Sequence, residues 1–257
     1  LKDAQALGFA EAEPSLDIDG HDTAHKLAIL NSLAHGMAIN LADIHVEGIR
    51  NITPVDIDFA REFGYTIKLL AIGKAHNDRV EARVHPTMIP ASHPLSHVDQ
   101  SMNAIVIDAT ATGQTMLYGK GAGMMPTASA VLSDIADIAR NIISGARQRM
   151  PVLGYPDSRI RERAILPMAE LRCRYYLRFE AVDQPGVLST ISGILGQHNI
   201  SIESVHQKGR SDSGAVPIVM ITHEAGEADV QSALVDITGS RSITGDPVLI
   251  RIEDQAE

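Results

Sequence analysis

The strongest constraint on the fold is the order of β-rich and helical segments in residues 172–257. Strands and helices alternate there in the order βαββαβ, at 175–181, 186–197, 200–205, 216–222, 227–236 and 247–252. In about 80 residues this order produces a four-stranded antiparallel sheet with two helices on one face. We therefore expect residues 172–257 to form a second, C-terminal domain.

Two helices are expected in the first half of the chain. Apolar residues recur at the helical period from 22 to 36, where Asp19 or Asp22 is the expected N-cap. The second helix begins at Thr53-Pro54 and ends at Gly64. Threonine is a good N-cap, proline fits the first helical turn, and glycine commonly ends a helix.

Two β-rich runs follow, at 65–75 and 79–89, and a short polar segment separates them. In the second run Val80, Ala82 and Val84 alternate with charged or polar residues. This pattern predicts an antiparallel pair of strands with one side facing solvent.

The remaining segments complete the predicted domain organisation. Shorter strands are expected at 103–108 and 114–118, and a glycine loop then leads into a helix that ends near residue 143. Weak periodicity with several prolines marks residues 146–171 as a connection between domains. The predicted division is therefore 1–145, 146–171 and 172–257.

The composition excludes several classes of protein. The chain has 32 Asp+Glu against 22 Lys+Arg, a net charge of −10 and no Lys/Arg-rich run, so nucleic acid is not an expected partner. Its single cysteine, Cys173, cannot form an internal disulfide, which favours a reducing compartment and a cytoplasmic location. No run approaches the ~18 apolar residues of a membrane helix, and no signal peptide is recognisable. Because the chain begins at Leu1 without Met, we expect a fragment of a longer protein.

The acidic stretch at residues 8–26 is the main candidate site. Asp22 and Lys26 are four residues apart, so they lie on one face of the expected helix and can pair. Glu11, Asp17 and Asp19 precede them in a loop that can fold back over the helix start. The alternative is a surface helix whose acidic first turn is favoured by the helix dipole.

His21 and His25 have the spacing of a zinc-protease pair, with an acid between them. A third ligand is not evident, and the charge of Lys26 would oppose a metal dication. We therefore expect no metal. The histidines at 85, 93 and 97 lie near prolines, and we expect them in loops with a structural or solvent-facing role.

The whole stretch resembles the signature of the homoserine dehydrogenase family. The matching positions are Ala4, Gly8, Pro14, Asp17-Ile18-Asp19-Gly20, Asp22 and Lys26, and Glu13 departs from the residue types usual before the proline. The similarity continues through 46–49, 64–70, 83–86 and 119–131. The resemblance implies an antiparallel-sheet substrate and dimerisation domain, within a homo-oligomeric enzyme that reversibly reduces L-aspartate 4-semialdehyde to L-homoserine for threonine, methionine and isoleucine biosynthesis.

By this resemblance, Lys26 is the catalytic acid or base with Asp22 beside it. Glu11, Asp17 and Asp22 take substrate-binding positions. The chemistry agrees, because hydride transfer to an aldehyde builds negative charge on oxygen, and an ammonium group can stabilise that charge and deliver a proton. Carboxylates also suit the α-amino group of such a substrate.

The resemblance also implies an NADP or NAD cofactor, with Gly121 and Gly123 beside the nicotinamide. The loop at 119–123 is not a dinucleotide fingerprint, and as a structural feature it is equally a tight turn. The domain that holds most of the cofactor is expected to be missing, so this chain alone is expected to be incomplete for catalysis.

The C-terminal segment resembles an ACT domain, which is a small amino-acid-sensing module. The resemblance is carried by the βαββαβ order, by Asp183-Gln184-Pro185-Gly186-Val187-Leu188 and by His198-Asn199-Ile200-Ser201-Ile202. It implies a ferredoxin-like fold and an effector site at Asp183, Gly186 and Asn199, with threonine as the expected effector. The alternative for the turn is a plain strand-to-helix connection, and the alternative for the chain is a non-catalytic amino-acid-binding regulator whose first domain only dimerises.

Overall fold

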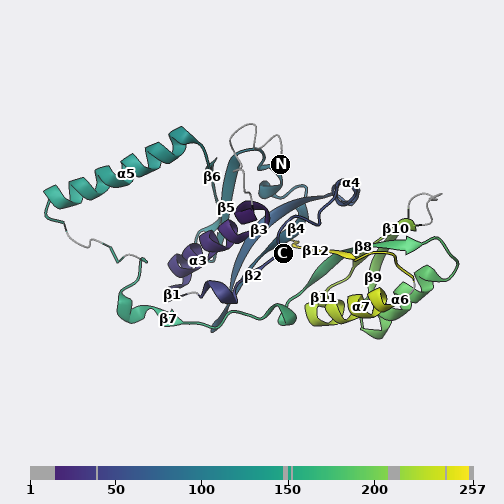
Figure 1. Ribbon diagram of the computed structural model, residues 1–257. Coiled ribbons are helices and arrows are strands. Elements are labelled where there is room, and N and C mark those ends of the chain that lie inside the picture. Colours follow the sequence, from purple (N-terminus) through teal and green to yellow (C-terminus); the bar gives the residue numbers. More distant parts are fainter. Residues whose placement is uncertain are drawn as a thin grey trace.

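The computed structural model describes residues 15–38, 40–146, 150–151, 153–207, 215–240 and 242–254. Most of the strands belong to one eight-stranded sheet with the order β2-β4-β12-β8-β10-β9, in which β3 also pairs with β4 and β11 with β8. The fold is α+β, as predicted (Figure 1). None of the described helices is long and apolar enough to cross a membrane.

The predicted helices and strands of the first half are confirmed. They are α3 (His21–His35), α4 (Pro54–Glu62), β3 (Tyr65–His76) and β4 (Arg79–Pro90). The short α2 (Ser15–Ile18) precedes α3, and the short β2 (His45–Val46) lies between α3 and α4. The N-cap of α3 is neither Asp19 nor Asp22 but Gly20, which has a φ of 83° and makes no side-chain cap. Asp19 does not cap α3, because Arg50 binds both oxygens of its carboxylate.

The prediction that one side of β4 faces solvent is wrong, because both sides of this strand are buried. The polar side of β4 carries Glu81, Arg83, His85 and Thr87, all less than 9% exposed. These groups are tolerated inside because they bind one another and the end of the chain: Arg83 donates to Glu81 at 2.7 Å and to Glu253 at 2.8 Å. His85 therefore lies in a buried strand and not in the expected loop.

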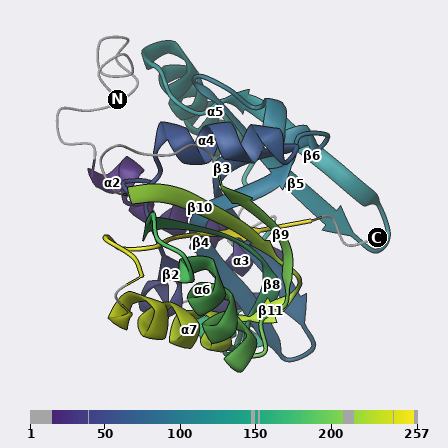
Figure 2. The ribbon, with the colours of Figure 1, turned by 90° about the vertical axis from the view of Figure 1, so that its right-hand side faces the viewer.

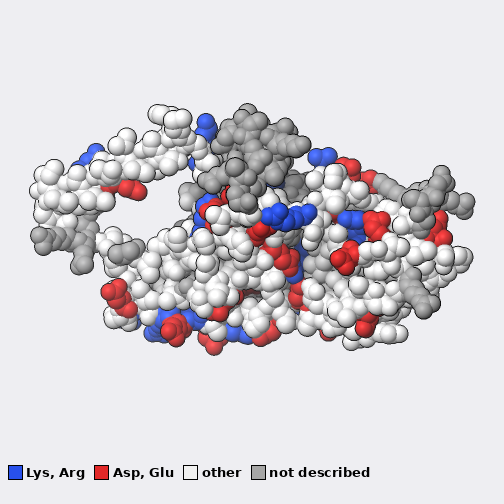
Figure 3. All heavy atoms as spheres, in the orientation of Figure 1, with Lys and Arg blue, Asp and Glu red and all other residues white. Residues whose placement is uncertain are grey.

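A hairpin and a long helix extend from this body. The hairpin consists of β5 (Met102–Ala109) and β6 (Gly113–Lys120), which pair only with each other among the described strands, and α5 (Met124–Ile143) follows. No described residue of α5 is buried. Figure 1 shows the helix standing away from the sheet, and Figure 3 shows its surface as largely uncharged.

The segment after α5 returns to the first half of the chain. Its short strand β7 (Arg161–Glu162) pairs in parallel with β1 (Met37–Ala38), and Val80 forms a parallel bridge to Ile165. The expected connection at 146–171 is thus bound along part of its course to the body of the molecule.

The C-terminal segment has the predicted βαββαβ order. Its elements are β8 (Arg172–Val182), α6 (Val187–Gln197), β9 (Ile202–Gln207), β10 (Ala215–Thr222), α7 (Glu227–Gly239) and β12 (Val248–Ile252), with a short β11 (Ala225–Gly226) before α7. Alternate residues of β8, such as Tyr175, Leu177 and Phe179, pack against the two helices in one apolar core. This is the predicted antiparallel sheet with both helices on one face.

The other face of this sheet is covered by the first half of the chain. Figure 2 shows α4 on the side of the sheet opposite α6 and α7. Phe59 and Ala60 of α4 share a core with Tyr176, Val219 and Ile250. The strand β12 also pairs in parallel with β4, so a continuous sheet joins the two halves.

Candidate functional site

The pair expected at the start of α3 forms in the structure. Lys26 Nζ donates to Asp22 Oδ2 at 2.5 Å. The Lys26 side chain is 61% exposed and that of Asp22 is 42% exposed, so both remain accessible to a solute. Ala24 and Leu27 face the opposite way and are buried against β4, which fixes the helix on the sheet.

Asp17 lies on α2, one short turn before α3, and is exposed. Its neighbour Asp19 is bound by Arg50, which donates to its two carboxylate oxygens at 2.5 and 2.9 Å. The hydrogen bond from Arg50 lowers the pKa of Asp19. The structure thus places Asp17, Asp22 and Lys26 on consecutive turns, whereas Glu11 lies outside the described residues.

The loop between α2 and α3 is held by the segment after β2, which the sequence marked only through the family similarity at 46–49. A Cβ atom added to Gly48 would lie 2.3 Å from the carbonyl oxygen of Ile18, so only glycine permits this approach. The amide of Ile49 donates to that same oxygen at 2.8 Å. The segment after β2 therefore supports the backbone on which Asp17 and Asp22 are carried.

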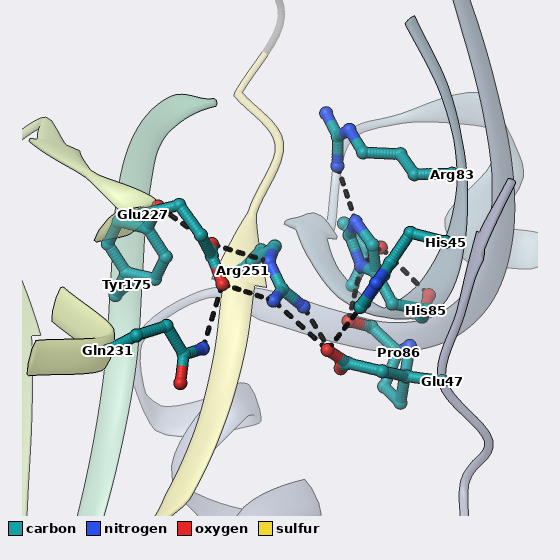
Figure 4. Close-up of polar contacts among 10 residues, drawn as sticks. His45, Glu47, Arg83, His85, Pro86, Tyr175, Glu227, Gln231 and Arg251 are labelled. Atoms are coloured by element: carbon teal, nitrogen blue, oxygen red, sulfur yellow. Dashed lines mark hydrogen bonds and ion pairs between the residues drawn. The ribbon is translucent and has the colours of Figure 1, made fainter. Parts of the chain in front are cut away.

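Beside this support lies a buried polar network that crosses between the two halves (Figure 4). Arg251 of β12 is 2% exposed and lies between two carboxylates. It donates to Glu47 at 3.0 Å through each of two nitrogens, and to Glu227 of α7 at 2.5 and 2.8 Å. Tyr175 and Gln231 complete the hydrogen bonds of Glu227.

The electrostatics of the network are set by burial and by these partners. Burial raises the pKa of Glu47, but hydrogen bonds from His45 and Arg251 outweigh it and hold the pKa at about 2. Burial, with the charges of Arg251 and Arg83, lowers the pKa of His85 well below its usual value. Arg83 donates to Nε2 of His85 while Nδ1 faces the Pro86 carbonyl, which fits a neutral ring protonated on Nδ1.

The glycine loop before α5 brings backbone close to a side-chain amide. A Cβ atom on Gly121 would lie 1.4 Å from Nδ2 of Asn103, so glycine is required there unless that side chain moves. Gly123 precedes the first turn of α5 with a φ of 122°. The close approach and the amides of the helix start fit a carboxamide or phosphate group of a dinucleotide.

The three residues expected at an effector site do not meet within one chain. Gly186 is the N-cap of α6, with a φ of 93°, and a Cβ atom there would meet nothing within 4 Å. Asp183 is exposed nearby, whereas Asn199 lies just past the other end of α6. An 11-residue helix separates them by about 16 Å. Asp183 and Asn199 thus lie at opposite ends of α6.

Within the described ranges, no cluster of His, Cys, Asp and Glu side chains could hold a metal ion. His21 and His25 lie on the first turns of α3, and both are exposed. The zinc alternative gains no support from this geometry.

Comparison with known proteins places this arrangement in a family. The family model described as homoserine dehydrogenase matches residues 1–136, which include the helix with Asp22 and Lys26 and the glycine loop. The chain belongs to the homoserine dehydrogenase family. A model described as an ACT domain matches residues 175–237.

Individual homoserine dehydrogenases are similar over nearly the whole chain. The enzyme of Neisseria gonorrhoeae is 43% identical over 98% of this chain, and that of Helicobacter pylori is 45% identical over 99%. The crystal structure of a homoserine dehydrogenase from Thiobacillus denitrificans matches with a TM-score of 0.88 at 41% identity. The match to the crystal structure includes 99% of this chain. The chain spans only 58% of the length of each of the two curated relatives and 57% of the length of the crystallised protein.

Proposed function

We propose that the protein containing this chain is a homoserine dehydrogenase that reversibly reduces L-aspartate 4-semialdehyde to L-homoserine with NAD(P)H. The observation that carries the proposal is the exposed Asp22–Lys26 pair beside Asp17, on the segment that matches the family. The proposed pathway leads to threonine, methionine and isoleucine, and the proposed setting is a homo-oligomer in the cytoplasm.

In this proposal, Lys26 is the proton donor and acceptor of the reaction. Its exposed Nζ reaches a substrate bound over α3, while Asp22 holds the ammonium in place through their hydrogen bond. The ammonium stabilises the negative charge that develops on the aldehyde oxygen and then protonates it. Asp17, together with Glu11, supplies carboxylates for the substrate α-ammonium group.

Two variants of Lys26 test this role in the full-length enzyme. Lys26→Ala removes both charge and proton, and we expect kcat to fall by about 10² to 10⁴ with little change in cofactor affinity. Lys26→Arg keeps the charge and the pairing with Asp22, but a guanidinium does not give up its proton at neutral pH, so kcat should also fall. An unchanged kcat in both variants would remove Lys26 from the mechanism. Absence of homoserine oxidation in the wild type would favour the non-catalytic regulator instead.

We assign NADP or NAD as the cofactor, with Gly121 and Gly123 at its nicotinamide end. The bound cofactor supplies the hydride, and the glycine loop orients that end of it through backbone amides. Gly121→Ala pushes against the Asn103 side chain, so the KM of the cofactor should rise while the KM of homoserine stays nearly constant. An equal rise in both KM values would indicate general damage to the hairpin. Binding titrations of this chain with NADPH should show no tight binding, because no dinucleotide-binding βαβ unit with its glycine fingerprint is found among the described residues to hold the pyrophosphate.

The C-terminal module is assigned a regulatory role, with threonine as its effector. The open space at Gly186 supports access to the amides at the start of α6, which suit a carboxylate. Asp183, together with Asn199 from a paired copy, then accepts the effector ammonium. Inhibition by threonine, methionine, isoleucine and lysine should be compared in the wild type, Asp183→Asn and Gly186→Val. If none of the four inhibits the wild type, or if both variants are inhibited like the wild type, the module does not sense at this turn.

A further inference from the structure

The supporting segment at residues 45–50 contacts two parts of the molecule at once. On one side it contacts the α2–α3 turn: the Ile49 amide donates to the Ile18 carbonyl, and Arg50 donates to Asp19. On the other side it contacts the C-terminal module, through Glu47 and Arg251. Gly48 and Ile49 directly follow Glu47, so a shift at Glu47 is carried to them within two residues.

The contact with Arg251 is built to be rigid. The guanidinium binds Glu47 through two nitrogens, and the same guanidinium is fixed on its other side by Glu227 at the start of α7. A planar fork held between two carboxylates has little freedom to move. Figure 4 shows Arg251 lying between the two acids, which come from opposite halves of the chain.

The contact between segment 45–50 and the α2–α3 turn is tightly packed. Gly48 approaches so closely that a side chain would meet the Ile18 carbonyl and the Cα of Asp19. Gly20, the N-cap of α3, is also packed, because a Cβ there would lie 3.3 Å from Val46 Cγ1 and 3.4 Å from the Glu47 carbonyl. Displacement of Glu47 therefore displaces the turn between Asp17 and Asp22.

We propose that Glu47 and Arg251 are positioning residues for the substrate-binding carboxylates. Their ion pair fixes segment 45–50, and this segment holds the α2–α3 turn in the geometry that binds the substrate ammonium. The inference rests on the proposed dehydrogenase activity, and it adds two residues outside the signature stretch at 4–26, one of them from the C-terminal module. Neither residue contacts the substrate.

Glu47→Gln is the sharpest variant, because it keeps the size of the side chain and removes its charge. Glu47 also borders an open cleft of about 380 Å³ together with Gln231 and Leu249, so the new amide can be solvated and the fold should survive. The matched control is Glu253→Gln. Glu253 likewise links the end of the chain to β4, through Arg83 at 2.8 Å, and no contact described for it reaches segment 45–50 or the α2–α3 turn.

In the full-length enzyme, Glu47→Gln should raise the KM of homoserine at least tenfold, with kcat and the KM of the cofactor changed less than threefold. Glu253→Gln should leave all three constants within threefold of the wild type. Arg251→Lys, which keeps the charge but loses the fork, should give an intermediate KM. A role limited to folding would reduce the amount of active enzyme, and hence the apparent kcat, without moving KM. Equal KM values in Glu47→Gln and the wild type would overturn the proposal.

Hydrogen exchange tests the same inference without activity. In the 257-residue chain, Glu47→Gln should speed exchange at the Ile49 amide and in peptides from 15–24, whereas Glu253→Gln should not. Unchanged exchange in both variants would overturn the positioning role even if the enzyme is active. If Glu47→Gln speeds exchange but the full-length wild-type enzyme has no dehydrogenase activity, the structural linkage stands and the dehydrogenase proposal is refuted instead.

Discussion

The junction between the two halves and the α5 helix contrast in what they do with charged and apolar side chains. At the junction, charged groups such as Arg83, Arg251 and Asp56 are buried, and each has a partner of opposite charge. Along α5, large apolar side chains are exposed instead, including Ile135 at 56% and Ile138 at 58%. The junction is thus a surface completed within the chain, whereas the apolar side of α5 has no cover among the described residues.

The contrast shows that burial depends on the partner and not on residue type alone. A buried charge is tolerated when ion pairs and hydrogen bonds replace its hydration. Apolar side chains of a helix gain their stabilisation only where another surface removes them from water. The junction should therefore be sensitive to loss of one partner, and α5 should be insensitive to loss of its apolar groups in this chain.

Asp56→Ala should produce the largest effect on stability. Asp56 is fully buried, caps α4 through Thr53 and accepts hydrogen bonds from Tyr176 and Arg178 of the other half. Its removal leaves a buried guanidinium with a lost partner, so the free energy of unfolding should fall by about 3–5 kcal/mol. Denaturant unfolding of the chain measures this.

The control for this variant is Asp58→Ala, which lies on the same helix. Asp58 is exposed and pairs with Arg61 at 3.7 Å, a long contact between two solvent-facing side chains. Its removal should change the free energy of unfolding by less than about 1 kcal/mol. Similar losses in the two variants would show that the junction does not depend on its buried ion pairs.

The sequence predicted the secondary structure of this junction but not its burial. The alternation of Val80, Ala82 and Val84 identified β4 correctly, yet alternation alone does not tell a polar side that faces water from one that faces a buried arginine. One partner of that side, Glu253, comes from the end of the chain, 170 positions after Arg83. Local periodicity carries no information about such a contact.

The candidate site shows the same division. Spacing alone predicted the pairing of Asp22 with Lys26, because four residues correspond to about one helical turn. The roles of Gly48 and Arg50 depend on an approach of the segment after β2 to the α2–α3 turn, and no spacing pattern specifies it. The local signals for this approach are the glycine directly after Glu47 and the family similarity at 46–49.

A pH titration should sharpen the account of the junction through His85. The folded protein holds this histidine neutral, because burial and two arginines lower its pKa well below 6.5. Below about pH 6.5 the unfolded chain therefore takes up a proton that the folded chain does not, and stability falls as the pH falls. Between pH 6.5 and 5 this group accounts for a loss of up to about 2 kcal/mol.

His85→Gln isolates this contribution, because glutamine does not titrate and its oxygen accepts a hydrogen bond from Arg83. Its unfolding free energy should depend less on pH between 6.5 and 5 than that of the wild type. His93, whose pKa burial also lowers, provides the comparison. His93→Gln should flatten the curve less, since its ring is only partly buried. Parallel curves for the wild type and His85→Gln would contradict a neutral buried His85.

Asn31 is a buried polar group without the pairing seen at the junction. Among the described side chains that are not exposed, its Nδ2 is the buried polar atom that lacks a hydrogen-bond partner. Asn31→Ala removes this unsatisfied donor and improves helix propensity, so the free energy of unfolding should rise by about 1 kcal/mol or stay unchanged.

A double-mutant cycle with Gly73 tests the reason. A Cβ atom on Gly73 would lie 2.3 Å from Oδ1 of Asn31, so Gly73→Ala should be destabilising in the wild type and much less so in Asn31→Ala. Additive effects of the two changes would show that the amide is not confined between α3 and β3.

The smallest effect is expected on α5, in the double variant Ile135→Gln, Ile138→Gln. Both side chains are more than half exposed, and glutamine is a good helix former, so the free energy of unfolding of this chain should change by less than about 0.5 kcal/mol. Leu27→Gln on α3 is the matched control, because Leu27 is 4% exposed in the core beneath the candidate site, and it should cost several kcal/mol. Sedimentation at several concentrations should accompany both measurements. If the α5 variant is destabilised like Leu27→Gln and the wild type associates more strongly than the variant, the apolar side of α5 is covered in solution by another copy of the chain, and the contrast with the junction disappears.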